Sequence, residues 1–296
     1  MEERDGAMAL ESGEDLRPPL RNLVHGLREV ASQLREGESF WKSEDFDLQF
    51  FWKTLGVTLR RLVRDATMDI VEGVIQLLNV ILSTPLQSLS QDQLTSTGGV
   101  WEACDRFSKI PKDNQAAVLS VMSSYAAIVE DALEEMEQAR RADNPDPFSD
   151  IFDDDDDADL RENRDTYWSE ADKQVMAPCL GLLKAAKACL KKVSGAMKTH
   201  GKVDTLQHIT QLDDLGDITS EVSPSVDELV LSLYPPMNYI TVQMNAAKVA
   251  SVLNKVLEIT KSSHMCPESE SSWLQFLSGA IDHNMDKVKN LTQGTI

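Results

Sequence analysis

A run of five aspartates, residues 153–157, is the segment whose residue types and spacing come closest to a chemical site. Alternate carboxylates of this kind open the calcium-binding loop of an EF-hand. With Asp153 at position one, however, position six is Ala158, where the loop needs glycine, and position twelve is Arg164, where it needs glutamate. The sequence predicts a solvated charge run instead, and it leaves weak divalent binding or electrostatic docking to a basic protein surface as alternatives. The candidate partner-binding residues in this run are Asp153, Asp154, Asp155, Asp156 and Asp157.

The other reactive side chains are too scattered to form a recognisable site. The five histidines stand in no metal or nucleophile motif, and we expect His208, beside apolar neighbours, to have a structural or surface role. The four cysteines form no close pair and have no histidines at zinc-ligand spacing. Gly98 and Gly99 follow polar residues and indicate a loop before a helix rather than a phosphate-binding turn. These patterns predict a protein that is not an enzyme and holds no metal or cofactor.

The overall charge excludes several classes of partner. The 296 residues include 49 acidic and 29 basic side chains, which gives a net charge of −20. Nucleic acids and anionic membranes are bound chiefly through lysine and arginine, so we expect neither as a partner. The most apolar window, residues 70–82, is shorter than the roughly 20 residues of a membrane-spanning helix, so no such span is expected. The acidic N-terminus is unlike a signal peptide and predicts a reducing compartment, the cytoplasm or the nucleus.

The acidic residues are concentrated in one segment. Residues 143–165 contain 11 acidic and 2 basic side chains, a net charge of −9. An Asn-Pro-Asp-Pro sequence at its start is expected to stop the preceding helix, and repulsion among the aspartates favours an extended, solvated chain. We therefore predict an N-terminal helical bundle over residues 1–142, an acidic disordered linker over 143–166 and a C-terminal helical bundle over 167–296.

Apolar residues recur at steps of three and four, the spacing of amphipathic helices, along most of the chain. Before the acidic segment the pattern covers residues 16–34, 51–81, 99–107 and 113–141, with Gly56 as a candidate break. After it the pattern covers residues 169–201, 206–218, 223–233, 240–256 and 273–291. A capping sequence at Ser169 and Asp172 is expected to open the first of these, and Ser223 with Pro224 the third. No segment alternates like a strand, so the chain is expected to be all-α and folded as antiparallel bundles.

Three leucines near the N-terminus repeat every seven residues, and we predict them as a second set of candidate partner-binding residues: Leu20, Leu27 and Leu34. Such a repeat can form the edge of a helical dimer. It spans only about two heptads, fewer than the three or four that indicate a coiled coil. Packing within the chain's own bundle is therefore favoured, and the oligomeric state stays open.

Eight short segments carry a resemblance to a known family. The first is LRRLVRDATMDIV at residues 59–71, and the others lie at residues 110–114, 134–139, 167–170, 188–192, 223–227, 234–237 and 257–261. In this order they resemble the cyclin-D-binding, Maid-like proteins of animals. The segments span most of the chain from Leu59 to the end, although none of them is diagnostic alone.

The resemblance implies two helical bundles similar in build to those of vinculin, talin and α-catenin. It also implies a non-enzymatic negative regulator of the cell cycle that binds D-type cyclin and restrains cyclin-dependent phosphorylation of the retinoblastoma protein, in the nucleus and the cytoplasm. Helix-loop-helix transcription factors, inhibited by sequestration, and a haematopoietic adaptor are further implied partners. A helical scaffold or adaptor of the adhesion or cytoskeletal type is the alternative that this architecture leaves open.

The chain departs from the family in one place. Family members carry a long additional helical stretch between the residues that match Phe51-Trp52 and those that match Leu59. This chain is therefore expected to be an internally shortened form. Because bundle helices share one core, the loss of about two helices is expected to leave apolar stripes of the N-terminal bundle uncovered.

Overall fold

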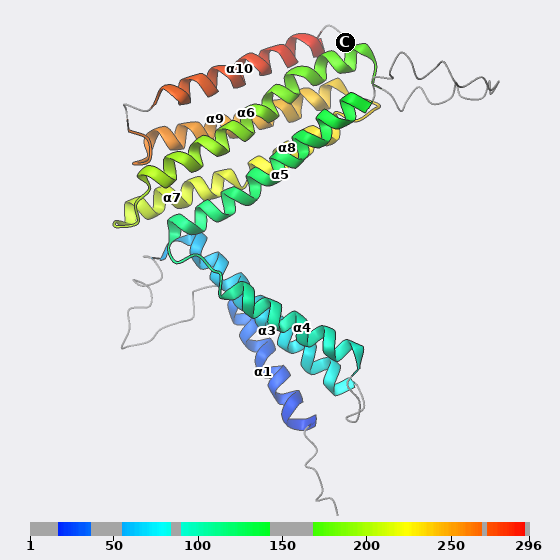
Figure 1. Cartoon of the computed structure of the whole chain (residues 1–296), viewed down its shortest axis with the longest axis vertical. Coiled ribbons are helices and arrows are strands. Elements are labelled where there is room, and N and C mark those ends of the chain that lie inside the picture. The colour runs from blue at the N-terminus through cyan, green and yellow to red at the C-terminus, as the bar shows by residue number, and fades with distance from the viewer. Residues whose placement is uncertain (1–16, 37–54, 84–89, 143–167, 268–270, 294–296) are drawn as a thin grey trace, which may run out of the picture. The chain divides into compact units, whose positions relative to one another are not determined.

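The computed structural model describes residues 17–36, 55–83, 90–142, 168–267 and 271–293 (Figure 1). Within these ranges the regular elements are helices and there is no strand, which confirms the predicted all-α class. The predicted acidic linker, with Asp153 to Asp157, lies outside the described residues. The arrangement as two bundles joined by that linker stays a prediction.

Nine helices cover the described residues, and they fall into two compact units. The first unit comprises Met1–Gln49 and Arg60–Ile110, and the second comprises Phe50–Leu59 and Pro111–Ile296. The helices are α1 (Arg17–Glu36), α3 (Val57–Ser83), α4 (Gln91–Phe107), α5 (Asn114–Ala142), α6 (Glu170–His200), α7 (Leu206–Thr219), α8 (Val222–Ser232), α9 (Tyr239–Ser262) and α10 (Ser272–Gln293).

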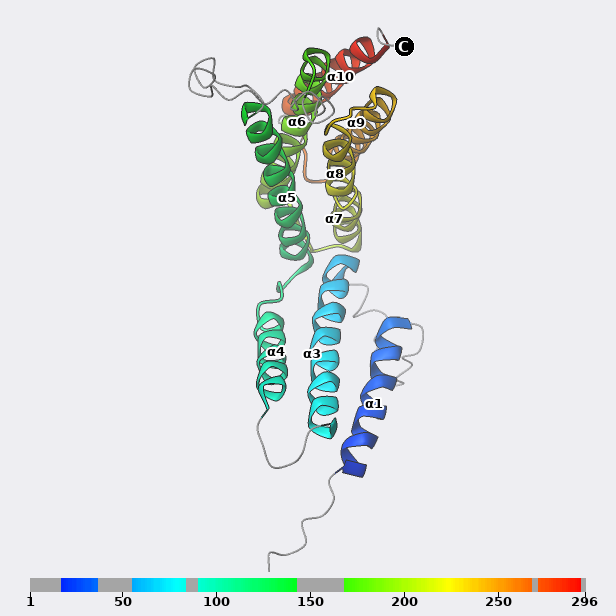
Figure 2. The same cartoon turned by 90° about the vertical axis from the view of Figure 1, so that its right-hand side faces the viewer.

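The second unit encloses the main hydrophobic core of the described residues. Helix α6 packs against α5, α9 and α10, while α8 packs against α5 and α9 (Figure 2). Side chains of α6 such as Met176, Leu182 and Leu190 are completely buried. Burial of one such side chain contributes roughly 1.5–3 kcal/mol relative to exposure. The helix begins as predicted, because Ser169 and Asp172 form a reciprocal capping box.

The first unit has far less buried surface. Among its described side chains only Val24, Ala31, Leu78 and Ala103 are buried apolar residues. The apolar side chains along α3 are otherwise half-buried, and α1, α3 and α4 approach one another less closely than the helices of the second unit do. Three helices of this length therefore leave a substantial part of their apolar surface in contact with water.

Two helices have a length and composition that would also suit a membrane span. Both α3 and α5 contain an 18-residue window with a mean hydropathy of 1.4. A third of the α5 window is buried, and α5 packs against α6, α7 and α8 as a core helix of the second unit. Only 11% of the α3 window is buried. The expectation that the chain has no membrane span stays a prediction.

Two helix starts differ from the sequence-based expectation. Helix α4 begins at Gln91, because Ser90 and Gln93 form a capping box, and Gly98 and Gly99 lie inside the helix rather than in a loop before it. The interpretation of the glycine pair as a loop is therefore wrong. Helix α8 begins at Val222, so that Ser223 is a buried residue of its first turn and not its N-cap.

The boundary between the compact units does not lie at the acidic segment, and the predicted domain bounds stay a prediction. The predicted N-terminal bundle ended at residue 142 and so included α5, whereas the structure divides at Ile110 and places α5 in the second unit. The reason is packing: α5 buries Val118, Met122 and Met136 in the common core with α6. Both helices that flank the acidic segment, α5 and α6, thus belong to one unit.

A buried carboxylate fixes the start of α3. Asp213 on α7 accepts hydrogen bonds from the backbone N–H of Val57 (2.7 Å) and from both the backbone N–H (2.9 Å) and the hydroxyl (2.8 Å) of Thr58. It also accepts one from the Asn114 side chain at 2.9 Å, and Asn114 in turn accepts the Leu59 N–H at 3.1 Å. A negative charge at a helix N-terminus is favourable because the free N–H groups converge there. Asp213 therefore acts as the N-terminal cap of α3 from another helix.

Gly56, the residue before the first turn of α3, confirms the candidate break. Gly56 has a φ of +76°, in the left-handed region that favours glycine, and a Cβ there would collide with the Asn114 side chain. The chain therefore turns sharply at Gly56 before α3 begins.

We predict that Asp213→Ala destabilises the chain by about 2–3 kcal/mol, because the α3 N–H groups and the Asn114 amide lose a charged, buried acceptor. Urea unfolding followed by circular dichroism measures the free energy. Asp214→Ala, an exposed neighbour on the same helix, serves as the matched control. A loss below about 0.5 kcal/mol for Asp213→Ala, within the usual range for a surface substitution, would show that the cap has no structural role.

Candidate partner-binding surfaces

The leucine repeat predicted as a partner-binding edge lies on α1. Leu20, Leu27 and Leu34 are half-buried there, beside the buried Val24 and Ala31. The repeat thus lies along the packed side of the helix, as expected for packing within the chain. Its role in binding a partner stays a prediction.

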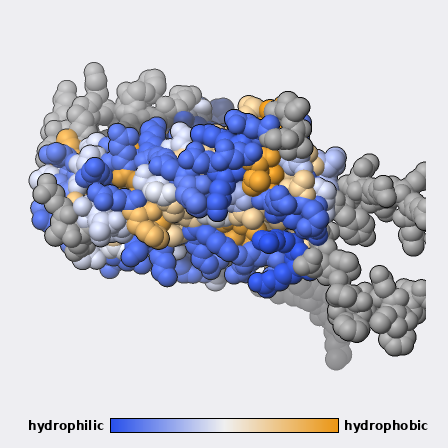
Figure 3. All heavy atoms as spheres, turned by 90° about the horizontal axis from the view of Figure 1, so that it is seen from above, coloured by the Kyte–Doolittle hydropathy of each residue, from blue (hydrophilic) through white to orange (hydrophobic). Residues whose placement is uncertain are grey.

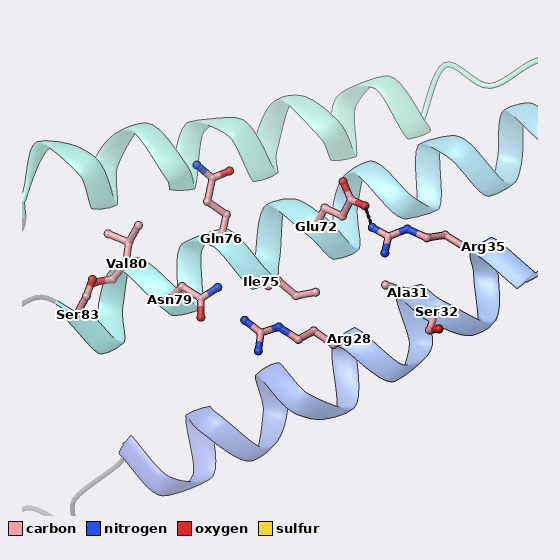
Figure 4. A pocket seen from close by; sticks show the side chains of 10 residues that line it. All are labelled: Arg28, Ala31, Ser32, Arg35, Glu72, Ile75, Gln76, Asn79, Val80 and Ser83. Atoms are coloured by element: carbon pink, nitrogen blue, oxygen red, sulfur yellow. Dashed lines mark hydrogen bonds and ion pairs between the residues drawn. The ribbon is translucent and has the colours of Figure 1, made fainter.

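A groove of about 860 Å³ runs between α1 and α3 (Figure 4). Arg28 and Arg35 extend into it from α1, and Arg35 forms an ion pair with Glu72 of α3. The remaining lining residues mix polar and apolar side chains: Ala31, Ser32, Ile75, Gln76, Asn79, Val80 and Ser83. The ion pair is largely exposed on both sides, so it contributes little to stability, and the groove remains open to solvent.

The outer face of α4 exposes large apolar side chains. Leu94 is 55% exposed and Trp101 is 72% exposed, and both lie on the side of the helix opposite the buried Ala103. The sequence did not reveal this face, because the helix predicted from it began at residue 99, which separated Leu94 from Trp101. The seven-residue spacing of the two side chains is the signal that identifies it once the helix is known to begin at Gln91.

A histidine pair joins the first turn of α7 to the segment that follows α9. The rings of His208 and His264 stack with their centroids 4.2 Å apart, and His208 also contacts Asp204 through Nδ1 at 2.5 Å. His264 Nε2 accepts the Lys202 N–H at 3.0 Å, and its Nδ1 lies 2.6 Å from the Gln211 side-chain oxygen. This pattern assigns the proton of neutral His264 to Nδ1. The structural role expected for His208 is consistent with this arrangement.

The cysteines differ sharply in their surroundings. Burial raises the pKa of the Cys179 and Cys189 thiols to about 12. Cys104 is exposed on α4, and Cys266 is half-buried. Among the described residues no cluster of histidine, cysteine or carboxylate side chains has the geometry to hold a metal ion.

The second unit also exposes large apolar side chains, among them Leu231 on α8 and Ile240 and Met244 on α9. The face drawn in Figure 3 is mostly hydrophilic, with separate hydrophobic patches between hydrophilic residues. Single exposed residues such as Phe276 on α10 are normal for a protein surface.

The helices and their exposed faces define an all-α protein whose surfaces suit contact with other proteins. Two family models match the sequence: the N-terminal model of the Grap2 and cyclin-D-interacting proteins covers residues 49–142, and the C-terminal model covers residues 152–258. The chain belongs to the Grap2 and cyclin-D-interacting family. The break between the two models lies in the acidic segment.

Curated relatives extend this match. The chain is 52% identical to the cyclin-D1-binding protein 1 homolog of Xenopus laevis, with 94% of this chain and 99% of the relative covered. It is 56% identical to the homolog of Danio rerio over 82% of this chain and 71% of the relative. It is 46% identical to cyclin-D1-binding protein 1 of Homo sapiens over 82% of this chain and 70% of that protein.

The frog relative is longer than this chain. Their alignment spans 332 positions, and 94% of 296 residues is about 278, so about 54 positions of the relative have no counterpart here. This difference agrees with the expected internal shortening. Its place between Phe51-Trp52 and Leu59 stays a prediction.

We predict that His264 makes the chain less stable in mild acid. Burial, and then the charges of His208 and Lys202, lower the pKa of His264 below its usual 6.5, while Asp204 acts weakly in the opposite direction. As the pH falls below 6.5, the unfolded chain therefore binds the proton first, and stability present above that pH is lost. His264→Asn, which keeps a donor and an acceptor, should show a smaller fall in melting temperature between about pH 7 and pH 5. Parallel profiles of melting temperature against pH for the two chains would contradict this role of His264.

The cysteine environments predict selective alkylation. Because the thiolate is the nucleophile, iodoacetamide at about pH 8 should modify Cys104 before Cys179 and Cys189, which should react only in denaturant. Peptide mass mapping at several times measures the order. Equal rates at Cys104 and Cys179 in the native chain would contradict the packing of α6.

Proposed function

We propose that this chain is a non-enzymatic regulator that binds a D-type cyclin and restrains cyclin-dependent phosphorylation of the retinoblastoma protein. The observation that carries the proposal is the family match, together with relatives from frog, fish and human whose names state that they bind cyclin D1. The chain would thereby slow cell-cycle progression and the transcription that depends on it. We place this activity in the cytoplasm and the nucleus.

The mechanism we propose is occupation of the partner's surface. Exposed apolar side chains on α1 and α4 and the open groove between α1 and α3 provide contact area in the first unit. The net charge of −20 favours a partner with a basic face and speeds the encounter with it. Grap2, which the family description names, is a further candidate partner. Helix-loop-helix transcription factors are another.

We predict that the purified full-length chain binds a purified D-type cyclin with a dissociation constant below about 10 μM, the range of a specific interface of ordinary size. Isothermal titration calorimetry gives the constant and the stoichiometry. Titration of the chain into an assay of retinoblastoma phosphorylation by the cyclin-D-dependent kinase should then lower the rate in step with the fraction of cyclin bound.

A kinase assembled with a cyclin of another class is the control for nonspecific inhibition. Equal inhibition of both kinases would contradict the proposed specificity. The absence of heat and of any complex at about 100 μM of each protein would overturn the cyclin proposal itself.

A further inference from the structure

A stripe of three residues along the outer face of α4 combines two large apolar side chains with a gap between them. Leu94, Gly98 and Trp101 stand four and seven residues apart, so at 3.6 residues per turn they lie on one side of the helix. We call these residues the α4 stripe. All three are exposed, and tryptophan is among the residues most enriched at the energetic centres of protein interfaces.

No neighbouring atom among the described residues of the fold requires a glycine at position 98. A Cβ added at Gly98 would meet nothing within 4 Å. Gly73 of α3 is different, because a Cβ there would come within 3.3 Å of the Val100 side chain of α4. Glycine inside a helix is less favourable than alanine, so the fold alone gives no reason for it at position 98. An absent side chain there does, however, let another surface approach the backbone between Leu94 and Trp101.

The charges beside the stripe are acidic. Asp105 lies one turn beyond Trp101 and makes no ion pair with any described residue. Glu102 pairs with Arg106 at 3.0 Å, and the same Arg106 contacts Asp69 of α3 at 3.3 Å. Arg106 is thus already engaged by two carboxylates. The stripe therefore ends at a carboxylate that is available to a partner.

We propose that the α4 stripe is the docking face for the cyclin partner, with Trp101 and Leu94 entering an apolar groove whose rim carries basic side chains. This inference rests on the proposed function and names the surface that performs it. The partner helix or loop passes over Gly98, and Asp105 faces a lysine or arginine at the rim. Burial of the two side chains supplies most of the affinity, and the carboxylate fixes the orientation.

The charge pattern decides between the possible occupants. A second copy of the chain carries the same net charge of −20, which opposes self-association, although Arg28 and Arg35 of its α1–α3 groove are basic side chains that it could offer. An anionic membrane would repel the carboxylates of Glu102 and Asp105. A protein with a basic rim is attracted, which is why we assign the stripe to a protein partner rather than to self-association.

The first test replaces the two apolar side chains one at a time in the full-length chain and measures affinity for a purified D-type cyclin. Trp101→Ala should weaken binding at least about 10-fold, and Leu94→Ala about 3-fold or more. Phe276→Ala removes an aromatic side chain that is 75% exposed on α10 and is the matched control, with unchanged affinity expected. Circular dichroism should give the same melting temperature for all four chains, because the replaced side chains are exposed.

The second test uses the two adjacent glycines. Gly98 and Gly99 are both exposed and open, but only Gly98 lies on the stripe. Alanine at either position should raise the melting temperature, because glycine is unfavourable inside a helix. Gly98→Ala should nevertheless weaken cyclin binding, whereas Gly99→Ala should leave it unchanged. A variant that is more stable yet binds less tightly cannot be explained by misfolding.

Cys104 provides an independent readout beside the stripe. It is exposed three residues beyond Trp101, and its alkylation should slow when the cyclin is bound. Alkylation of Cys266, in the other unit, should keep its rate.

The outcomes separate this inference from the proposed function. If the unaltered chain binds the cyclin but Trp101→Ala and Gly98→Ala bind equally well, the docking face is overturned while the proposed function stands. If the unaltered chain does not bind the cyclin, both are overturned. Trp101-dependent dimerisation, or Trp101-dependent binding to phosphatidylserine vesicles without cyclin binding, would likewise overturn the assignment of a protein with a basic rim.

Discussion

The apolar surface of α3 is the constraint on which the rest of the account depends. Its half-buried side chains have only α1 and α4 as neighbours among the described residues of the first unit, and these helices leave them partly exposed. Each Å² of apolar surface left in water forgoes roughly 25 cal/mol. The open groove beside Arg28 is a consequence of the same shortage of cover. A frog relative with about 54 further positions has more chain with which to cover them.

The second unit shows what a complete core provides. Helices α5 to α10 bury their apolar stripes together, and the first turn of α7 is joined to the segment after α9 through His208 and His264. Asp213 holds the first turn of α3 within this unit by three hydrogen bonds and accepts a fourth from Asn114 of α5. The chain thus combines a well-packed unit with one whose apolar surface is less enclosed, and the less enclosed unit has more to gain from a partner.

Much of the fold follows from local sequence, because a helix is defined by neighbours three and four residues away. The stripes and the capping box at Ser169 identified most helices, and the break at Gly56 followed from the residue type. The start of α4 was missed because two glycines outweighed a capping box at Ser90. The place of α5 and the cap from Asp213 depend on contacts between residues far apart in the sequence, 57 positions for Glu130 and Lys187 and 155 for Thr58 and Asp213, on which periodicity carries no information. For the same reason the exposure of Trp101 could not be predicted.

Hydrogen exchange of the full-length chain, with and without a saturating D-type cyclin, tests the central claim most directly. It reports on the backbone amides of each helix without any substitution. The account predicts added protection within residues 91–107, with α10 unchanged. Protection confined to α6 to α10, or no difference between the free and mixed samples, would contradict it.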